Sequence, residues 1–177
     1  MFLLRYHDIE KYIQSDYEVS LSLEHFEGHF EGIANDYGLD LCPDFQRDVV
    51  WDESRQVKYV EHLLRGGNSA NTLYFNSPVW GGYELRPDCD LDETLLCIDG
   101  LQRYTSIIKF LKNEIKAFGL YRNEFEGKIP SSISIKVNVH NLQTRKEVLE
   151  WYLQLNSGGM AHTEEELNRV RELLYNC

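Results

Sequence analysis

The 177-residue sequence lacks a long uninterrupted hydrophobic stretch. No apolar run approaches the roughly 20 residues that a membrane-spanning helix needs. Residues 1–12 carry charges throughout and lack the apolar stretch and small-residue cleavage site of a secretory signal peptide. We therefore expect a cytoplasmic protein that does not bind membranes.

Recognised metal and phosphate motifs are also missing. The sequence contains no GxxxxGK(S/T) phosphate loop and no GxGxxG dinucleotide motif. Its cysteines form no Cys-x-x-Cys pair and have no zinc-ligand spacing. They are Cys42, Cys89, Cys97 and Cys177. We expect free thiols, with Cys97 in a buried strand, and no zinc, haem or flavin.

Basic residues are scarce, since 18 Lys and Arg stand against 29 Asp and Glu, for a formal net charge of -11. Proteins that bind duplex DNA usually neutralise its phosphates with a basic face. Two interpretations remain open: a solvated acidic surface that maintains solubility, or a surface that mimics nucleic acid or docks onto a basic partner. Tight unaided DNA binding is disfavoured unless a basic strip forms from Arg47, Arg55, Lys58 and Arg65.

Hydrophobic residues make up 42% of the chain, which is typical of a globular protein with a real core. Alternating or continuous apolar segments predict strands at residues 17–23, 72–76, 94–98 and 133–139, with an extended segment at 39–45. Helical spacing predicts helices at residues 24–37, 52–64, 101–115, 143–153 and 163–175. We expect a single α/β or α+β domain over residues 1–177, with a core at about 17–140 and C-terminal helices at about 143–175.

The segment TLLCIDGLQR contains the strongest candidate site. A buried strand runs into Asp99 and Gly100 and then directly into a helix, so the N–H groups of the helix start point beyond the strand. Gly100 permits a close backbone approach, Arg103 can bind a phosphate bidentately, and Gln102 lies beside it. Asp99 can hold a metal ion, accept a ribose hydroxyl or act as a base. In the alternative interpretation, Asp99 only caps the helix and Arg103 is a surface residue.

The segment PDFQRDVVW carries a second Gln-Arg dipeptide, Gln46 and Arg47, near another strand end. Two guanidiniums that converge on one anion would form a shared site. Alternatively, Arg47 pairs with Asp48 or Asp52, and Trp51 belongs to the core. The dipeptide alone does not decide between these interpretations.

The segment NSGG lies before the last predicted helix, whose Thr163 and Glu166 form a capping box. Its candidate phosphate-binding residues are Asn156, Gly158 and Gly159. The loop either faces a phosphate or is only a turn, because short Gly-containing motifs often match by chance.

Together, PDFQRDVVW, IDGLQRYTSI and LNSGGMAHTEEEL resemble, in this order, the N-terminal domain of GmrSD-type modification-dependent restriction enzymes. Phages and bacteria also encode this domain alone, and the chain would then work in the host cytoplasm if a phage encodes it. The resemblance covers roughly residues 39–174. The family is similar to the ParB/sulfiredoxin superfamily, which implies an α+β fold with a small mixed sheet of four to five short strands flanked by helices and a C-terminal helical portion.

The resemblance assigns the family's motif positions to specific residues of this sequence. The family's Asp-Gly-Gln-Gln-Arg motif falls on Asp99, Gly100, Leu101, Gln102 and Arg103. Its earlier Gln-Arg falls on Gln46 and Arg47, and its Asn-x-Gly-Gly turn on Asn156, Gly158 and Gly159. Leu101 replaces the first Gln of the motif, and its apolar side chain cannot make that residue's polar contacts.

The resemblance implies binding of a nucleoside triphosphate with Mg²⁺, and hydrolysis or transfer of its phosphoryl group. Gly100 and the helix-start amides, with the NSGG turn, would bind the phosphates. Arg47 and Arg103 would neutralise charge in the transition state. Asp99 would orient Mg²⁺ or the nucleophile, and Gln46 and Gln102 would position the reacting group or water.

The restriction enzymes also carry a nuclease domain with a histidine-metal motif, which this sequence does not contain. We therefore do not expect the chain to cleave DNA on its own. Two other functions stay open. One is a non-enzymatic interaction or anti-defence protein that binds a partner from a defence or modification system, and the other is a sensor of modified DNA.

Overall fold

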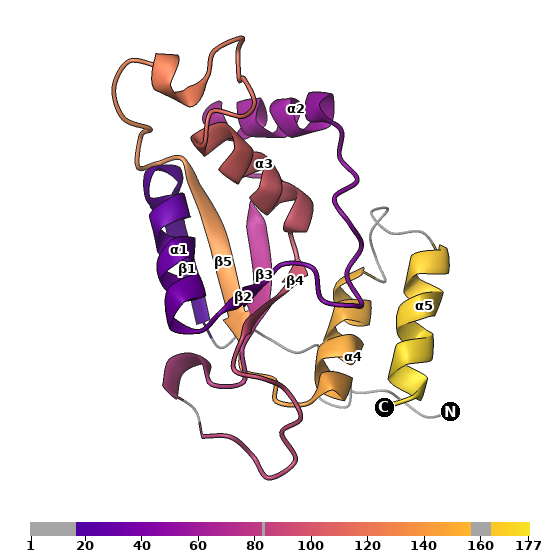
Figure 1. Ribbon diagram of the computed structural model, residues 1–177. Helices are drawn as coiled ribbons and strands as arrows, with labels where there is room; N and C mark the ends of the chain where they lie inside the picture. The colour runs from indigo at the N-terminus through magenta and orange to yellow at the C-terminus, as the bar shows by residue number, and fades with distance from the viewer. Residues whose placement is uncertain (1–16, 83, 157–163) are drawn as a thin grey trace, which may run out of the picture.

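The computed structural model describes residues 17–82, 84–156 and 164–177 (Figure 1). Within these ranges the chain has the predicted α+β architecture, with a five-stranded mixed sheet and five α-helices. The strands are β1 (Tyr17–Ser22), β2 (Leu39–Asp40), β3 (Thr72–Asn76), β4 (Leu95–Asp99) and β5 (Ser134–His140). The α-helices are α1 (Phe26–Asp36), α2 (Glu53–Leu64), α3 (Leu101–Leu111), α4 (Arg145–Asn156) and α5 (Glu164–Tyr175). Across the described residues, no helix has the length and apolar character that crossing a membrane requires.

The strands are arranged in the order β1-β5-β3-β4-β2. β5 pairs antiparallel with β1 and parallel with β3, while β4 pairs antiparallel with β3 and parallel with β2. Because β4 runs opposite to β3, its carboxyl end lies beside the beginning of β3, where Tyr74 pairs with Asp99. This pairing fixes where the chain leaves β4 and enters α3.

The sheet separates two hydrophobic cores. Phe75 and Cys97 face a larger core shared with α1, α2 and α3, whereas Tyr74 and Ile98 face a smaller core shared with α4 and α5. In Figure 1, α4 and α5 lie side by side, apart from the other three helices. β4 is therefore covered on both faces, as its continuous apolar run predicts.

Most predicted helix boundaries are confirmed. α1 buries Phe26, Phe30 and Ile33 and ends just before Gly38, whose φ is +80°. The Asp52 side chain caps α2 by accepting the N–H of Arg55 at 2.8 Å. α3 ends at Leu111, earlier than predicted, because the chain turns there into a left-handed residue at Asn113. All four cysteines are free thiols, and Cys97 is buried in β4 as expected.

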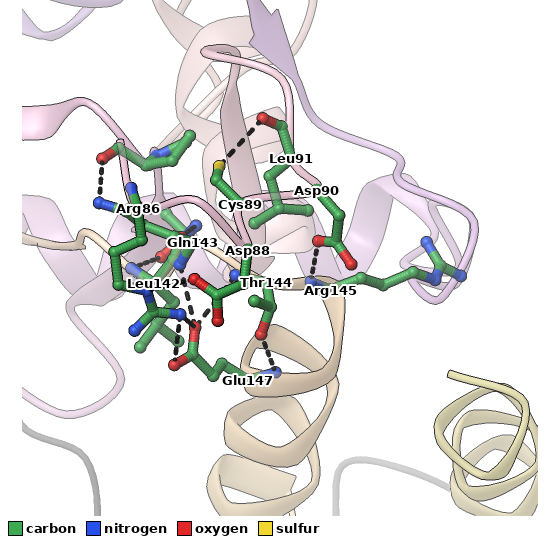
Figure 2. A network of polar contacts seen from close by, with 12 residues as sticks. Arg86, Asp88, Cys89, Asp90, Leu91, Leu142, Gln143, Thr144, Arg145 and Glu147 are labelled. Atoms are coloured by element: carbon green, nitrogen blue, oxygen red, sulfur yellow. Dashed lines mark hydrogen bonds and ion pairs between the residues drawn. The ribbon is translucent and has the colours of Figure 1, made fainter. Parts of the chain in front are cut away.

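The long connection between β3 and β4 is held against the beginning of α4 (Figure 2). Nη2 of Arg86 lies 2.9 Å from both carboxylate oxygens of Glu147. The same carboxylate accepts the N–H groups of Gln143 and Thr144 at 3.1 and 3.0 Å, and so caps α4. Burial raises the pKa of Glu147, but the hydrogen bonds from Arg86, Thr144 and Gln143 outweigh burial and lower that pKa overall. This network fixes the helix that forms one wall of the cavity described next.

Candidate functional site

A cavity of about 330 Å³ opens at the carboxyl end of β4. Its volume falls at the lower end of the roughly 300–1,000 Å³ typical of small-molecule sites. The cavity brings together every predicted site residue that the structure describes: Gln46, Arg47, Asp99, Gly100, Leu101, Gln102, Arg103 and Asn156. The other lining residues are Trp51, Arg55, Ala70 and Leu155. Gly158 and Gly159 lie outside the described residues.

Two other cavities of similar size lack this combination of groups. One is lined mainly by apolar and aromatic side chains of the segment 110–133, and the other by the carboxylates of Asp40, Asp44, Asp90 and Asp92. Only the cavity at β4, among these three, combines several guanidiniums with the beginning of a helix. It is therefore the cavity best suited to an anion.

α3 begins at the cavity without a capping side chain. Gly100 is its N-cap, with φ +118°, and the first helical hydrogen bond runs from the Tyr104 N–H to the Gly100 carbonyl at 2.8 Å. The N–H groups that precede this bond lie at the positive end of the helix. A Cβ on Gly100 would approach Leu73 Cδ2 to 2.5 Å, so both the φ and the packing require glycine here.

Asp99 and Arg103 form an ion pair across one turn, between Oδ2 and Nη2. The Arg103 side chain is 15% exposed and that of Asp99 is 31% exposed, so the pair lies partly buried in the cavity wall. The Asp99 carboxylate is the acidic group among the lining residues. An anion that approaches Arg103 therefore meets a negative charge beside it, unless a cation neutralises that charge.

The two glutamines of the Gln-Arg dipeptides bind backbone groups of each other's segments. Nε2 of Gln46 donates to the Ile98 carbonyl at 3.1 Å, at the end of β4. Oε1 of Gln102 accepts the N–H groups of Val50 and Trp51 at 2.9 and 3.0 Å, and its Nε2 donates to the Asp48 carbonyl at 2.9 Å. Gln102 is only 6% exposed. These hydrogen bonds join the two segments and leave Arg47 and Arg103 lining the cavity.

The C-terminal helices close one side of the cavity. Nη1 of Arg47 lies 3.8 Å from Oε2 of Glu166 in α5. Asn156, at the end of α4, is buried and donates from Nδ2 to the Tyr152 carbonyl at 2.8 Å. Burial raises the pKa of Tyr152 to about 12, although the Arg47 charge acts in the opposite direction. Tyr152 therefore stays neutral at physiological pH.

Trp51 and Arg55 are cavity residues that the sequence does not assign to the site. The Arg55 guanidinium lies over the Trp51 indole, with Cζ 4.7 Å from the ring centroid. The available sequence signal is their closeness in the chain: Trp51 comes just before the N-cap Asp52, and Arg55 lies in the first turn of α2. Ala70 and Leu155 carry no such signal.

Leu101 is 3% exposed and packs in the larger core, so it offers the cavity little beyond its backbone N–H. Among the described residues, no group of three or more His, Cys, Asp or Glu side chains is arranged to hold a metal ion. Mg²⁺ in nucleotide sites is usually held by one or two carboxylates together with the substrate phosphates. Asp99 fits that kind of site.

A family model described as GmrSD restriction endonuclease, N-terminal domain, matches residues 26–134, which is more than half of the chain. The fold is that of a small α+β domain, and the chain belongs to this GmrSD N-terminal domain family. The match includes both Gln-Arg dipeptides and places the chain in a restriction-related setting. No curated protein and no solved structure matched the chain.

Proposed function

We propose that the cavity at the end of β4 binds a nucleoside triphosphate with Mg²⁺ and hydrolyses it or transfers its γ-phosphoryl group. The observation that carries this proposal is the meeting of an uncapped helix start with the guanidiniums of Arg47 and Arg103 and the carboxylate of Asp99. Such a set matches the charge of a triphosphate and its metal ion. Membership of this family suggests that the activity serves restriction or phage defence.

Phosphate binding is assigned to the beginning of α3. The N–H groups after Gly100 and the guanidinium of Arg103 would contact the phosphate oxygens, and Arg47 and Asn156 line the same cavity. Asp99 would hold Mg²⁺, which supplies charge neutralisation on the phosphates. The two glutamines would act by positioning Arg47 and the helix start, because their amides hold backbone groups.

The reaction follows from this arrangement. A water molecule or an acceptor hydroxyl attacks the γ-phosphorus, and the bond to the oxygen that bridges the β- and γ-phosphorus breaks. The attacking oxygen loses its proton to solvent, and the nucleoside diphosphate leaves. Arg47 and Arg103 would stabilise the charge that spreads over the phosphoryl oxygens in the transition state.

Replacing Arg103 by alanine tests the proposal. Arg103→Ala should abolish the heat of binding of Mg-ATP and Mg-GTP in calorimetric titration while the circular dichroism spectrum stays that of the wild type. Lys58→Ala is the matched control, because Lys58 is exposed on α2 and does not line the cavity. Titration heats that are the same in Arg103→Ala and the wild type would contradict the proposal.

A second candidate function is docking onto a basic protein partner without catalysis. Four aspartates, Asp40, Asp44, Asp90 and Asp92, line one cavity of a chain with a net charge of -11. Such a surface favours binding to a basic surface. Incubation with ATP, GTP and CTP plus Mg²⁺ separates the two functions. Release of phosphate or a thermal shift supports the nucleotide site, and neither effect with any nucleotide supports the docking function.

A further inference from the structure

Trp51 lines the cavity, and the guanidinium of Arg55 lies over its indole ring. The ring lines the same cavity as Gly100 and Arg103 and is only half-buried. One neighbour is Tyr59, whose ring centroid lies 5.5 Å away in an edge-on arrangement. The other is the guanidinium of Arg55, an exposed residue, 4.7 Å from the ring centroid.

The backbone of Trp51 is fixed on both sides. Its N–H donates to Oε1 of Gln102 at 3.0 Å, and its carbonyl accepts from Nε2 of Gln56 at 2.9 Å. Gln102 is the residue before Arg103, so the backbone of Trp51 is held directly against the turn of α3 that would contact phosphate. A rigid aromatic residue beside an anion site is the arrangement that can bind both ends of a nucleotide.

We propose that Trp51 is the nucleobase-binding residue of this site, where the base stacks on the indole in place of the Arg55 guanidinium. The inference rests on the proposed nucleotide binding and adds its substrate class. A purine has two fused rings and covers more of the indole than a pyrimidine does, so the site takes purine nucleoside triphosphates. Arg55 is an exposed residue, and cation–π contacts at exposed sites are weak, so the base can replace its guanidinium on the ring.

Comparing a nucleotide with its phosphate chain alone tests this role. Calorimetric titration of the full chain with Mg²⁺ is expected to show ATP binding more tightly than inorganic tripolyphosphate, by between about fivefold and about a hundredfold. GTP should behave like ATP, and CTP should bind more weakly than either. Trp51→Ala should lower the affinity for ATP to that for tripolyphosphate, with the affinity for tripolyphosphate unchanged. Trp51→Phe should recover most of the difference.

Fluorescence gives a second readout that does not depend on the stability of Trp51→Ala. ATP should quench the fluorescence of the wild type, whereas tripolyphosphate should not. Trp51→Phe should lose the quenching, and Trp80→Phe should keep it, because Trp80 lies outside the cavity. Equal affinities of the wild type for ATP and tripolyphosphate, or quenching that persists in Trp51→Phe, would overturn the inference. If the protein binds tripolyphosphate as tightly as ATP, only the role of Trp51 is overturned. If the protein binds neither ligand, the proposed function is overturned as well.

Discussion

The backbone N–H of Trp51 donates to the side-chain Oε1 of Gln102 at 3.0 Å, across 51 residues of sequence. In the opposite direction, the Gln46 side chain donates to the Ile98 carbonyl. Each Gln-Arg dipeptide thus uses its glutamine to hold the other segment and its arginine to line the cavity.

Gln102→Ala should weaken both folding and ligand binding. The substitution removes three part-buried hydrogen bonds, to the N–H groups of Val50 and Trp51 and to the carbonyl of Asp48, and such a loss costs about 1–3 kcal/mol in total. We expect urea denaturation to show a loss of that size and titration to show weaker ATP binding. Lys58→Ala should stay within about 0.5 kcal/mol of the wild type. A Gln102→Ala protein as stable as this control would argue against the positioning role.

Asp99→Asn should uncouple nucleotide binding from Mg²⁺. The Asp99 carboxylate pairs with Arg103 and repels phosphate unless a cation is bound. In EDTA, the variant should bind ATP about tenfold more tightly than the wild type, a change that corresponds to about 1.4 kcal/mol. With Mg²⁺ present, the variant should gain little affinity and lose hydrolysis. The same metal dependence in both proteins would contradict this prediction, and the measurement is calorimetric titration with and without Mg²⁺.

Gly100→Ala should be far more destabilising than the same substitution at another left-handed glycine. Gly100 has φ +118°, and an added Cβ would lie 2.5 Å from Leu73 Cδ2. Gly66 has φ +80° but nothing within 4 Å of an added Cβ, so Gly66→Ala reports the backbone strain alone. We expect Gly66→Ala to cost about 1–2 kcal/mol and Gly100→Ala a further 1–3 kcal/mol or so, by urea denaturation. Equal losses of unfolding free energy in the two variants would show that the Leu73 side chain moves away from the added Cβ without destabilising the fold.

Stability should fall at acidic pH in part through Glu147. Hydrogen bonds from Arg86 and from backbone N–H groups keep the folded-state pKa of Glu147 below its ordinary value of 4.5. A lowered pKa gives stability that is fully present above about pH 4.5 and is lost as the pH falls through the folded-state value. Glu147→Gln should therefore be less stable than the wild type at neutral pH, and the difference should shrink near pH 3. A difference that does not change with pH would show that the charge of Glu147 is unimportant.

The fold was predictable where local patterns decide it. The run at residues 72–76 is β3 as predicted, and the apolar run before Asp99 predicts a strand covered on both faces. The strict alternation at residues 133–139 predicts a strand, and β5 is that strand, but alternation alone does not say what covers its polar face. In the structure both Asn138 and His140 are buried, since α4 covers that face and brings Trp151 to 3.8 Å from the His140 ring. Which helix packs on which face depends on long-range contacts that no local pattern contains.

The candidate site was predictable as a set of residues but not as a set of contacts. The two Gln-Arg segments were expected to meet, and they line one cavity. That the Gln102 amide binds backbone groups, or that Arg55 covers Trp51, could not be read from the sequence. Both depend on side-chain directions that only the packed structure defines. Whether the cavity binds a nucleotide stays a prediction.

The position of β5 has a consequence for any attempt to express part of the chain. The family match covers residues 26–134 and so stops at the first residue of β5, and it begins after β1. β5 lies between β1 and β3, so a fragment with the matched boundaries would retain only β3, β4 and β2 of the sheet. β3 would then become an open edge with unpaired N–H and carbonyl groups beside the buried side chains of Leu73 and Phe75. Such an edge promotes aggregation, so the smallest soluble unit has to include both β1 and β5.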